Sequence, residues 1–255
     1  MLLAIDAGNT NIVFGIHDGN KWVQEWRYNT VPVKNQIDYE MFLRMNFLEA
    51  DLRLSDVSGI IISSVVPQLN DILANFWSNL IAAEHVFVGP KYYGQLPIST
   101  VSPHEIGTDL IANATAAHLL HPGKTMVIDF GTALTFTVIE ASGNIRGVNI
   151  APGLKTAIKA LVGNTAQLPE VPLELPESAI GKNTIHAIQS GVLWGYVGMV
   201  EGMISRIKKE VGDDLKVVAT GGLSSILHPL HELFDAVDPK LTLEGLRLIH
   251  GIIKG

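Results

Sequence analysis

The sequence predicts an α/β fold in which one structural unit occurs twice. Short apolar strands alternate with segments of helical periodicity, and near the N-terminus a polar Asp-x-Gly-Asn turn joins two such strands. A related strand-turn-strand arrangement recurs about 120 residues later. Strands between helices favour sheets covered by helices, and the recurrence indicates duplication.

The first copy begins at the N-terminus. Residues 2–5 are apolar and lead into the turn Asp6-Ala7-Gly8-Asn9-Thr10-Asn11, after which residues 12–16 are apolar again. A second turn, Asp18-Gly19-Asn20, precedes a third strand over residues 22–28. Glycine, asparagine and aspartate favour tight turns, so this segment predicts strand, turn, strand, turn and strand.

The second copy lies in the middle of the chain. Strand 126–128 runs into Asp129-Phe130-Gly131-Thr132-Ala133, residues 134–139 alternate as a strand, and Ser142-Gly143-Asn144 forms the next turn. The two Asp-x-Gly turns therefore occupy matching contexts.

Helical periodicity fills most of the remaining chain, over residues 38–48, 68–81, 109–120, 154–168 and 185–211. Apolar strands are expected at 60–66 and 216–219, and the prolines of 168–176 indicate a loop. We expect a boundary near residue 117, with one lobe over residues 1–116 and the other over residues 117–255.

The long helix predicted over 185–211 contains four glycines, called here the glycine stripe: Gly191, Gly195, Gly198 and Gly202. Their spacing of 4, 3 and 4 residues places them on one helix face. Because each interior glycine costs about 0.5–1 kcal/mol relative to alanine, the stripe calls for close approach of another element. That element is either in the same chain or in a second subunit, and the sequence does not separate the two.

Composition excludes several classes of protein. The 255 residues include no cysteine, which rules out a disulfide scaffold, cysteine zinc sites and a thiol nucleophile. The net charge is −7 and no long run of Lys or Arg occurs, which disfavours binding to nucleic acid or to an anionic membrane. No signal peptide or membrane-spanning stretch is recognisable, so we expect a soluble, cytoplasmic protein.

The two Asp-x-Gly turns are candidate phosphate-binding elements. A turn rich in Gly, Asn and Thr exposes backbone N–H groups that can hold phosphates. Asp6 and Asp129, at the ends of their strands, could hold a cation beside them. Either turn alone is better explained as ordinary hairpin chemistry, but two copies in matching contexts favour a ligand site.

Two other polar segments allow both a structural and a functional interpretation. Thr108 and Asp109 open a predicted helix, where the hydroxyl would cap it and the carboxylate would complement its dipole. Asp109 could instead be an active-site base. Asn183 and Thr184 precede the glycine-striped helix, and either could be its cap.

An ordered set of motifs along nearly the whole chain resembles the type III pantothenate kinases. The motifs are Asp6-Ala7-Gly8-Asn9-Thr10-Asn11, Gly107-Thr108-Asp109, Asp129-Phe130-Gly131-Thr132, Pro152-Gly153, Gly181-Lys182-Asn183-Thr184, Gln189-Ser190-Gly191 and Ala219-Thr220-Gly221-Gly222. No single motif is specific, whereas their order and spacing are. The family belongs to the superfamily of acetate and sugar kinases, heat-shock ATPases and actin, so the resemblance implies two ribonuclease-H-like lobes.

The resemblance also implies an activity, cofactors and site residues. It implies ATP-dependent phosphorylation of pantothenate to 4′-phosphopantothenate, the first step of coenzyme A biosynthesis, by a homodimer that uses Mg²⁺ and a monovalent cation, K⁺ or NH₄⁺. Asp109 would accept the proton of the substrate hydroxyl, and Asp129 would bind the monovalent cation. ATP phosphates and Mg²⁺ would lie at Asp6, Ala7, Gly8, Asn9, Thr10, Asn11, Ile12 and Val13, with Thr132 also touching ATP. Pantothenate would contact Thr100, Gly107, Thr108, Asp109, Leu110 and Thr184.

Two departures from the family pattern fall in the pantothenate site. Leu110 stands where the family usually has an arginine, and Thr100 where it usually has a tyrosine. Losing an arginine that faces a carboxylate removes a contact of about 1.5–3 kcal/mol. The alternatives are therefore a kinase of the same fold acting on another small hydroxy acid or alcohol, and a nucleotide-binding regulatory protein without turnover.

Overall fold

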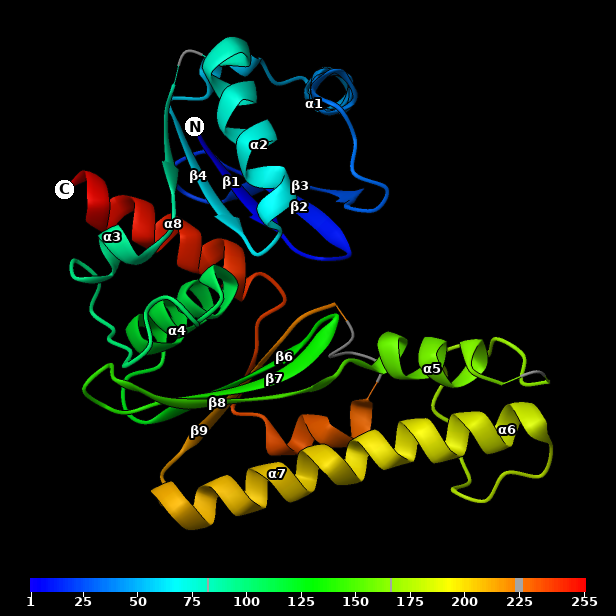
Figure 1. The fold of residues 1–255 in the computed structure, drawn as a ribbon. Coiled ribbons are helices and arrows are strands. Elements are labelled where there is room, and N and C mark those ends of the chain that lie inside the picture. Colours follow the sequence, from blue (N-terminus) through cyan, green and yellow to red (C-terminus); the bar gives the residue numbers. More distant parts are fainter. Residues whose placement is uncertain (82, 166, 223–226) are drawn as a thin grey trace. The chain divides into compact units, whose positions relative to one another are not determined.

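The computed structural model describes residues 1–81, 83–165, 167–222 and 227–255. The chain forms two compact units, Met1–Ala116 with Leu241–Gly255, and Ala117–Lys240. Each unit contains a five-stranded mixed sheet with helices packed against it (Figure 1). The predicted α/β class is confirmed.

The sheet of the first unit has the strand order β3-β2-β1-β4-β5. β1 pairs antiparallel with β2, and β2 antiparallel with β3, as the two predicted tight turns require. On the other side, β1 pairs parallel with β4, and β4 parallel with β5. The strands are β1 (Leu2–Ala7), β2 (Asn11–His17), β3 (Trp22–Asn29), β4 (Gly59–Ser64) and β5 (Glu84–Phe87).

The sheet of the second unit repeats this topology, with the order β8-β7-β6-β9-β10. Here β6 takes the place of β1: it pairs antiparallel with β7 and parallel with β9, while β7 pairs antiparallel with β8 and β9 parallel with β10. The duplication is confirmed in strand order and direction. The strands are β6 (Thr125–Phe130), β7 (Ala133–Ile139), β8 (Ile145–Pro152), β9 (Lys216–Thr220) and β10 (Ala236–Val237).

Helices of the first unit cover its sheet and define its core. The core joins β1, β2 and β4 to α1 and α2 through large apolar side chains such as Phe14, Phe47 and Trp77. The first of these helices begins two residues earlier than predicted, because Asn35 and Asp38 form a capping box. The helices are α1 (Gln36–Glu49), α2 (Pro67–Leu80), α3 (Pro90–Tyr93), α4 (Thr108–Leu120) and α8 (Leu241–Lys254), with a 3₁₀ turn at Leu54–Asp56.

Two helices of the second unit differ from their predicted extent. The segment expected as a helix over 154–168 forms α5 (Leu154–Gly163), which ends at the cap residue Asn164; residue 166 lies outside the described residues. The helix expected over 185–211 consists of α6 (Thr184–Gln189), a π-helical turn (Ser190–Trp194) and α7 (Gly195–Val211). A 3₁₀ turn follows at His228–Leu233.

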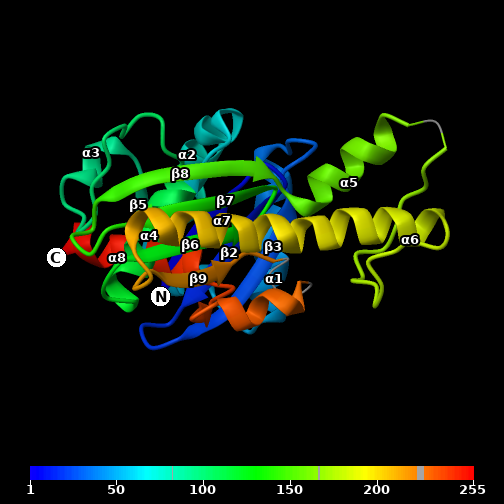
Figure 2. The same cartoon turned by 90° about the horizontal axis from the view of Figure 1, so that it is seen from below.

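The glycine stripe lies on the open side of α7. This helix runs along one face of the sheet (Figure 2) and buries Val200, Ile204 and their neighbours in the core. At 100° per residue, Gly195, Gly198 and Gly202 fall within about 60° of one another on the opposite side. No described atom outside the local helix lies within 4 Å of a Cβ built on any stripe glycine, including Gly191. The described chain therefore supplies no packing partner for the stripe.

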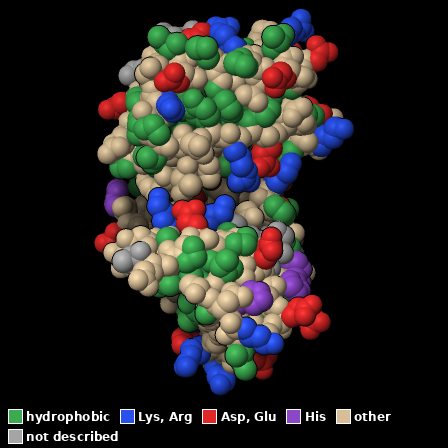
Figure 3. Space-filling model, turned by 90° about the vertical axis from the view of Figure 1, so that its right-hand side faces the viewer, with side chains coloured by type: hydrophobic (Ala, Val, Ile, Leu, Met, Phe, Trp, Pro, Cys, Tyr) green, Lys and Arg blue, Asp and Glu red, His purple; other side chains and the backbone are tan. Residues whose placement is uncertain are grey.

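Charges of both signs are mixed on the surface. On the face drawn in Figure 3, Lys and Arg side chains alternate with Asp and Glu. Among the described residues, no helix is long and apolar enough to cross a membrane.

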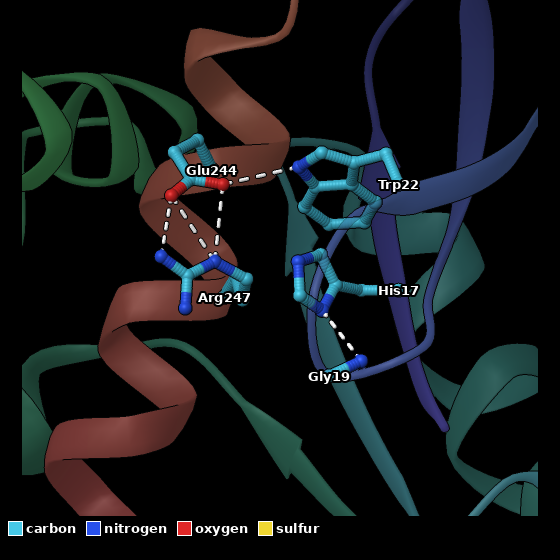
Figure 4. A network of polar contacts seen from close by, with 5 residues as sticks. All are labelled: His17, Gly19, Trp22, Glu244 and Arg247. Atoms are coloured by element: carbon cyan, nitrogen blue, oxygen red, sulfur yellow. Dashed lines mark hydrogen bonds and ion pairs between the residues drawn. The ribbon is translucent and has the colours of Figure 1, made fainter.

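The C-terminal helix α8 packs in the first unit, which differs from the expected extent of the second lobe. It lies against β1 and β4. A polar network also ties it to the hairpin of β2 and β3: Trp22 Nε1 donates to Glu244 Oε2 at 3.0 Å, and Arg247 Nε donates to Glu244 Oε1 at 3.1 Å (Figure 4). The edge of the Trp22 ring meets His17, with ring centroids 5.0 Å apart. Residues 241–255 thus belong with the start of the chain.

Candidate active site

Two parallel strands of the first unit end at the same edge of the sheet. Asp6 in β1 is the register partner of Ser63 in β4, and Ala7 is the partner of Ser64. Ligands of α/β sheets bind beyond the carboxyl ends of parallel strands. This edge, called here the β1–β4 edge, is therefore the natural place for a site in the first unit.

The turn after β1 is held by backbone hydrogen bonds. Gly8 N donates to Asn11 O at 3.0 Å. From the end of β3, Thr30 N donates to Thr10 O at 2.9 Å, and the Thr30 hydroxyl donates to Gly8 O at 2.6 Å. Asn9 and Thr10 remain exposed at the tip. The result is a fixed polar turn, as a phosphate-binding role requires.

Thr108 anchors the start of α4 at this edge. Its hydroxyl lies 2.9 Å from Ser63 Oγ, accepts from Ser64 N at 3.1 Å, and lies 3.3 Å from Ser64 O. The interpretation of Thr108 as a helix cap is wrong, because the side chain is engaged by β4 instead. The next residue, Asp109, is thereby brought to the same edge as Asp6.

The Asp109 carboxylate is largely buried and fixed by local contacts. Its Oδ1 accepts from Leu110 N at 2.8 Å. Gly107 leaves room for it, since a Cβ at that position would overlap the same oxygen. Burial raises the pKa of Asp109 above its ordinary value, although hydrogen bonds from the backbone oppose the rise. Burial also raises the pKa of Tyr93 to about 12, with a further contribution from the negative charge of Asp109.

Leu110 and Thr100, the two residues that depart from the family pattern, lie in different surroundings within the first unit. The Leu110 side chain is only 8% exposed and joins the apolar interior. Thr100, in the loop before α4, accepts a long hydrogen bond of 3.4 Å from Ser102 N through its hydroxyl.

The second unit contains the matching strand end. Asp129 in β6 pairs in register with Thr135 of β7 and with Thr220 of β9. Gly221 follows with φ +92°, and a Cβ there would lie 2.6 Å from Asp129 Oδ1. Only glycine adopts this conformation readily while letting the chain pass so close to the carboxylate.

The turn after β6 is likewise held in place. Gly131 N donates to Ala133 O at 3.1 Å, as Gly8 does to Asn11 in the first unit. The Thr132 carbonyl accepts from Gly153 N at 3.0 Å and from the Thr156 hydroxyl at 2.7 Å. Thr132 itself is exposed.

Residues 181–184 line a shallow hollow of about 650 Å³ in the second unit. Asn183 caps α6, since its Oδ1 accepts from His186 N at 2.9 Å, which settles the choice between Asn183 and Thr184. Thr184 is exposed in the wall of the hollow. Gly181 packs against the backbone of Ala187, where a Cβ would overlap.

Three residues of this arrangement escaped the sequence analysis. Ser63 and Ser64 end an apolar strand, and the rule that ligands gather at the carboxyl ends of parallel strands would have singled them out. Tyr93 carries no such signal in the sequence. No group of three or more His, Cys, Asp or Glu side chains among the described residues is arranged to hold a metal ion.

Comparison with known proteins gives a consistent result along the chain. A family model described as type III pantothenate kinase matches residues 2–206. The type III pantothenate kinase of Phenylobacterium zucineum is 42% identical over 246 residues and covers 96% of both chains. Those of Moorella thermoacetica and Myxococcus xanthus are 41% and 39% identical, each covering 98% of both chains.

Solved structures share the fold at low sequence identity. The ethanolamine utilization protein EutJ of Carboxydothermus hydrogenoformans has a TM-score of 0.56 and 17% identity, covering 97% of this chain and 89% of its own. A structure assigned to a 2-dehydro-3-deoxygalactonokinase of Sinorhizobium meliloti has a TM-score of 0.60 and 12% identity. The match covers 99% of this chain and 97% of that structure's chain. These structures therefore share the fold of this chain, with its two five-stranded mixed sheets.

Proposed function

The chain belongs to the type III pantothenate kinase family, and on that premise we propose how its own residues perform the reaction. The enzyme transfers the terminal phosphoryl group of ATP to pantothenate, the first step of coenzyme A biosynthesis. A P–O bond to ADP breaks, a P–O bond to the substrate hydroxyl forms, and the hydroxyl proton leaves. Because the transition state is loose, positioning and electrostatics supply most of the catalysis. The three relatives at 39–42% identity are all type III pantothenate kinases, and none of them favours another acceptor or a regulatory role.

Asp109 accepts the proton of the pantothenate hydroxyl. The observation that carries this assignment is the fixed, buried carboxylate: Thr108 ties its helix to the end of β4, and Leu110 N and Gly107 set its orientation. Burial raises the pKa of Asp109, which makes the carboxylate a better proton acceptor than an exposed aspartate.

The polar turn after β1 binds the ATP phosphates and Mg²⁺. Within residues 6–13, the exposed Asn9 and Thr10 at the tip of the turn offer small polar groups that suit phosphate oxygens. The Asp6 carboxylate is a hard oxygen ligand that suits Mg²⁺. The metal would neutralise charge on the transferred phosphoryl group. Thr132, exposed at the equivalent turn of the second unit, adds a contact to ATP.

Pantothenate contacts Gly107, Thr108 and Leu110 near the base, together with Thr100 and Thr184. The apolar Leu110 gives the substrate carboxylate no cationic partner at that position. We therefore expect weaker pantothenate binding than an arginine there would provide, by about tenfold or more.

Asp129 binds the monovalent cation. Its carboxylate stands at the end of β6 and is an oxygen ligand of the kind that K⁺ accepts. The cation would contribute to catalysis through its positive charge.

The active form is a homodimer joined through the second unit. The open glycine stripe of α7 supports this proposal, because it leaves the helix backbone accessible to another helix. Exposed apolar side chains in the same unit support it as well: Ile150 is 71%, Ile180 77% and Ile185 45% exposed.

The decisive experiment follows ADP release by the purified protein with ATP and Mg²⁺, with and without pantothenate, and identifies the phosphorylated product by mass spectrometry. ADP release that depends on pantothenate and is lost in Asp109→Asn supports the assignment. Asp213→Asn, at an exposed aspartate of the second unit, is the control and should match the parent. Full activity of Asp109→Asn would rule out Asp109 as the base.

A further inference from the structure

Asp129 lies between two threonines on one face of the second sheet. Its register partners are Thr135 in antiparallel β7 and Thr220 in parallel β9. Cross-strand partners point to the same face, with Cβ atoms about 4.5–5.5 Å apart in an antiparallel pair. The flanking residues Ile128 and Phe130 belong to the apolar core, so Asp129 and both threonines face away from it.

The Thr135 hydroxyl is buried and has no hydrogen-bond partner among the described residues. The residue is only 8% exposed. Buried hydroxyls in folded proteins nearly always have a partner, so an orphaned one beside a carboxylate requires an explanation. A cation held by that carboxylate provides it, because the hydroxyl oxygen can ligate the ion through a lone pair.

The equivalent carboxylate of the first unit lacks this arrangement. Asp6 has Val13 as its partner in β2 and Ser63 in β4. Valine offers no oxygen, and the Ser63 hydroxyl already lies 2.9 Å from Thr108 Oγ1. The two copies of the duplicated strand end therefore differ in their hydroxyl groups, and the orphaned one stands beside Asp129.

We propose that Thr135 supplies a ligand oxygen to the monovalent cation bound at Asp129. The inference rests on the proposed cation site and adds a neutral oxygen from β7 to it. A neutral hydroxyl suits a weakly hydrated monovalent ion, which is held by oxygen dipoles more than by charge. Thr135 thereby distinguishes the cation site of the second unit from the phosphate turn of the first.

The test measures the thermal unfolding midpoint of the full-length protein during titration with KCl, with choline chloride keeping the ionic strength constant. Binding to the folded state raises the midpoint, because it stabilises that state by RT ln(1 + [K⁺]/Kd). Thr135→Val removes the hydroxyl at nearly constant shape and keeps a β-branched residue in the strand. Thr137→Val is the matched control: its hydroxyl is also buried and orphaned, on the same strand and face, but its partner is Val127.

The parent and Thr137→Val should gain the same stabilisation from K⁺, and Asp129→Asn should gain none. Thr135→Val should need about tenfold more K⁺ for the same shift, while Thr135→Ser should resemble the parent. If Thr135→Val keeps the parental titration, or Thr137→Val is weakened equally, Thr135 is not a ligand and the site at Asp129 still stands. If the parent itself shows no specific response to K⁺, both the site and its proposed ligand are refuted.

Discussion

At the scale of a single residue, two opposing effects act on the pKa of the Asp109 carboxylate. Burial disfavours its charge, whereas the hydrogen bond from Leu110 N favours it, and burial is the larger effect. The folded protein therefore holds the Asp109 proton more tightly than the unfolded chain does. Stability falls as the pH rises from the ordinary pKa of aspartate through the raised one.

Asp109→Asn is thus expected to separate activity from stability. Loss of the proton acceptor should lower kcat by about 10²- to 10⁴-fold. The same change should raise the thermal unfolding midpoint at pH 7, because it removes a buried charge, and this gain should vanish near pH 3. Calorimetry at both pH values provides the check, and a variant less stable than the parent at pH 7 would contradict the sign of the pKa shift.

Gly107 offers a second prediction at the same scale. In Gly107→Ala the new Cβ would overlap Asp109 Oδ1, so the carboxylate must turn away from Leu110 N. We expect kcat to fall by about 10²-fold, as misplacement of a reacting group by 1 Å can cause, with the KM for ATP unchanged. Gly94→Ala is the control, because a Cβ there meets open space. Equal kinetics in the two variants would show that Gly107 does not orient the base.

At the scale of secondary-structure elements, Glu244 joins α8 to the hairpin of β2 and β3. Burial alone would raise its pKa, but hydrogen bonds from Arg247 and Trp22 hold the pKa of Glu244 below its usual range. A carboxylate with a depressed pKa stabilises the fold above its unfolded pKa, and this contribution is lost as the pH falls through the folded value. The attachment of α8 should accordingly weaken in acid.

Glu244→Gln should lower the free energy of unfolding at pH 7 by about 1–3 kcal/mol, since the hydrogen bonds to a charged acceptor are weakened. The matched control is Glu40→Gln, which breaks an exposed ion pair with Arg44 on α1 and should cost only about 0.5 kcal/mol. Urea denaturation measures both. The difference should shrink toward pH 4, and an equal cost in the two variants would exclude a role for the network in holding α8.

At the scale of the whole molecule, the glycine stripe of α7 is the proposed contact between the two subunits of the homodimer. Gly195→Leu places a bulky side chain where the proposed partner helix approaches. No described atom outside the local helix lies within 4 Å of a Cβ at that position. We expect light scattering at micromolar concentration to shift from dimer to monomer while the monomer stays folded. Glu201→Leu, on exposed α7 surface about 90° from the stripe, is the control and should remain dimeric. A parent protein with the mass of a single chain would overturn the proposed dimer.

The sequence by itself determined the elements whose causes are local. Glycine, asparagine and aspartate favour the tight turns that follow β1 and β6, so the two hairpins and their duplication were predictable. The ordered motifs were sufficient to predict the family and to nominate Asp109. The ends of helices were predicted less accurately than the turns, because cap residues such as Asn35 and Asn164 act over only a few residues.

Only the tertiary structure decided which groups meet across the chain. Hydrophobic periodicity predicts that a residue is buried but does not identify its neighbour. The sequence therefore did not predict that Thr108 contacts Ser63. It also did not predict that the Thr135 hydroxyl, on the strand paired with Asp129, has no hydrogen-bond partner among the described residues. The same limit explains why residues 241–255 were expected in the second lobe: chain order placed them there, whereas the helix that they form packs against β1 and β4. Hydrogen bonds and packing between distant segments depend on the path of the chain in three dimensions, which no local pattern encodes.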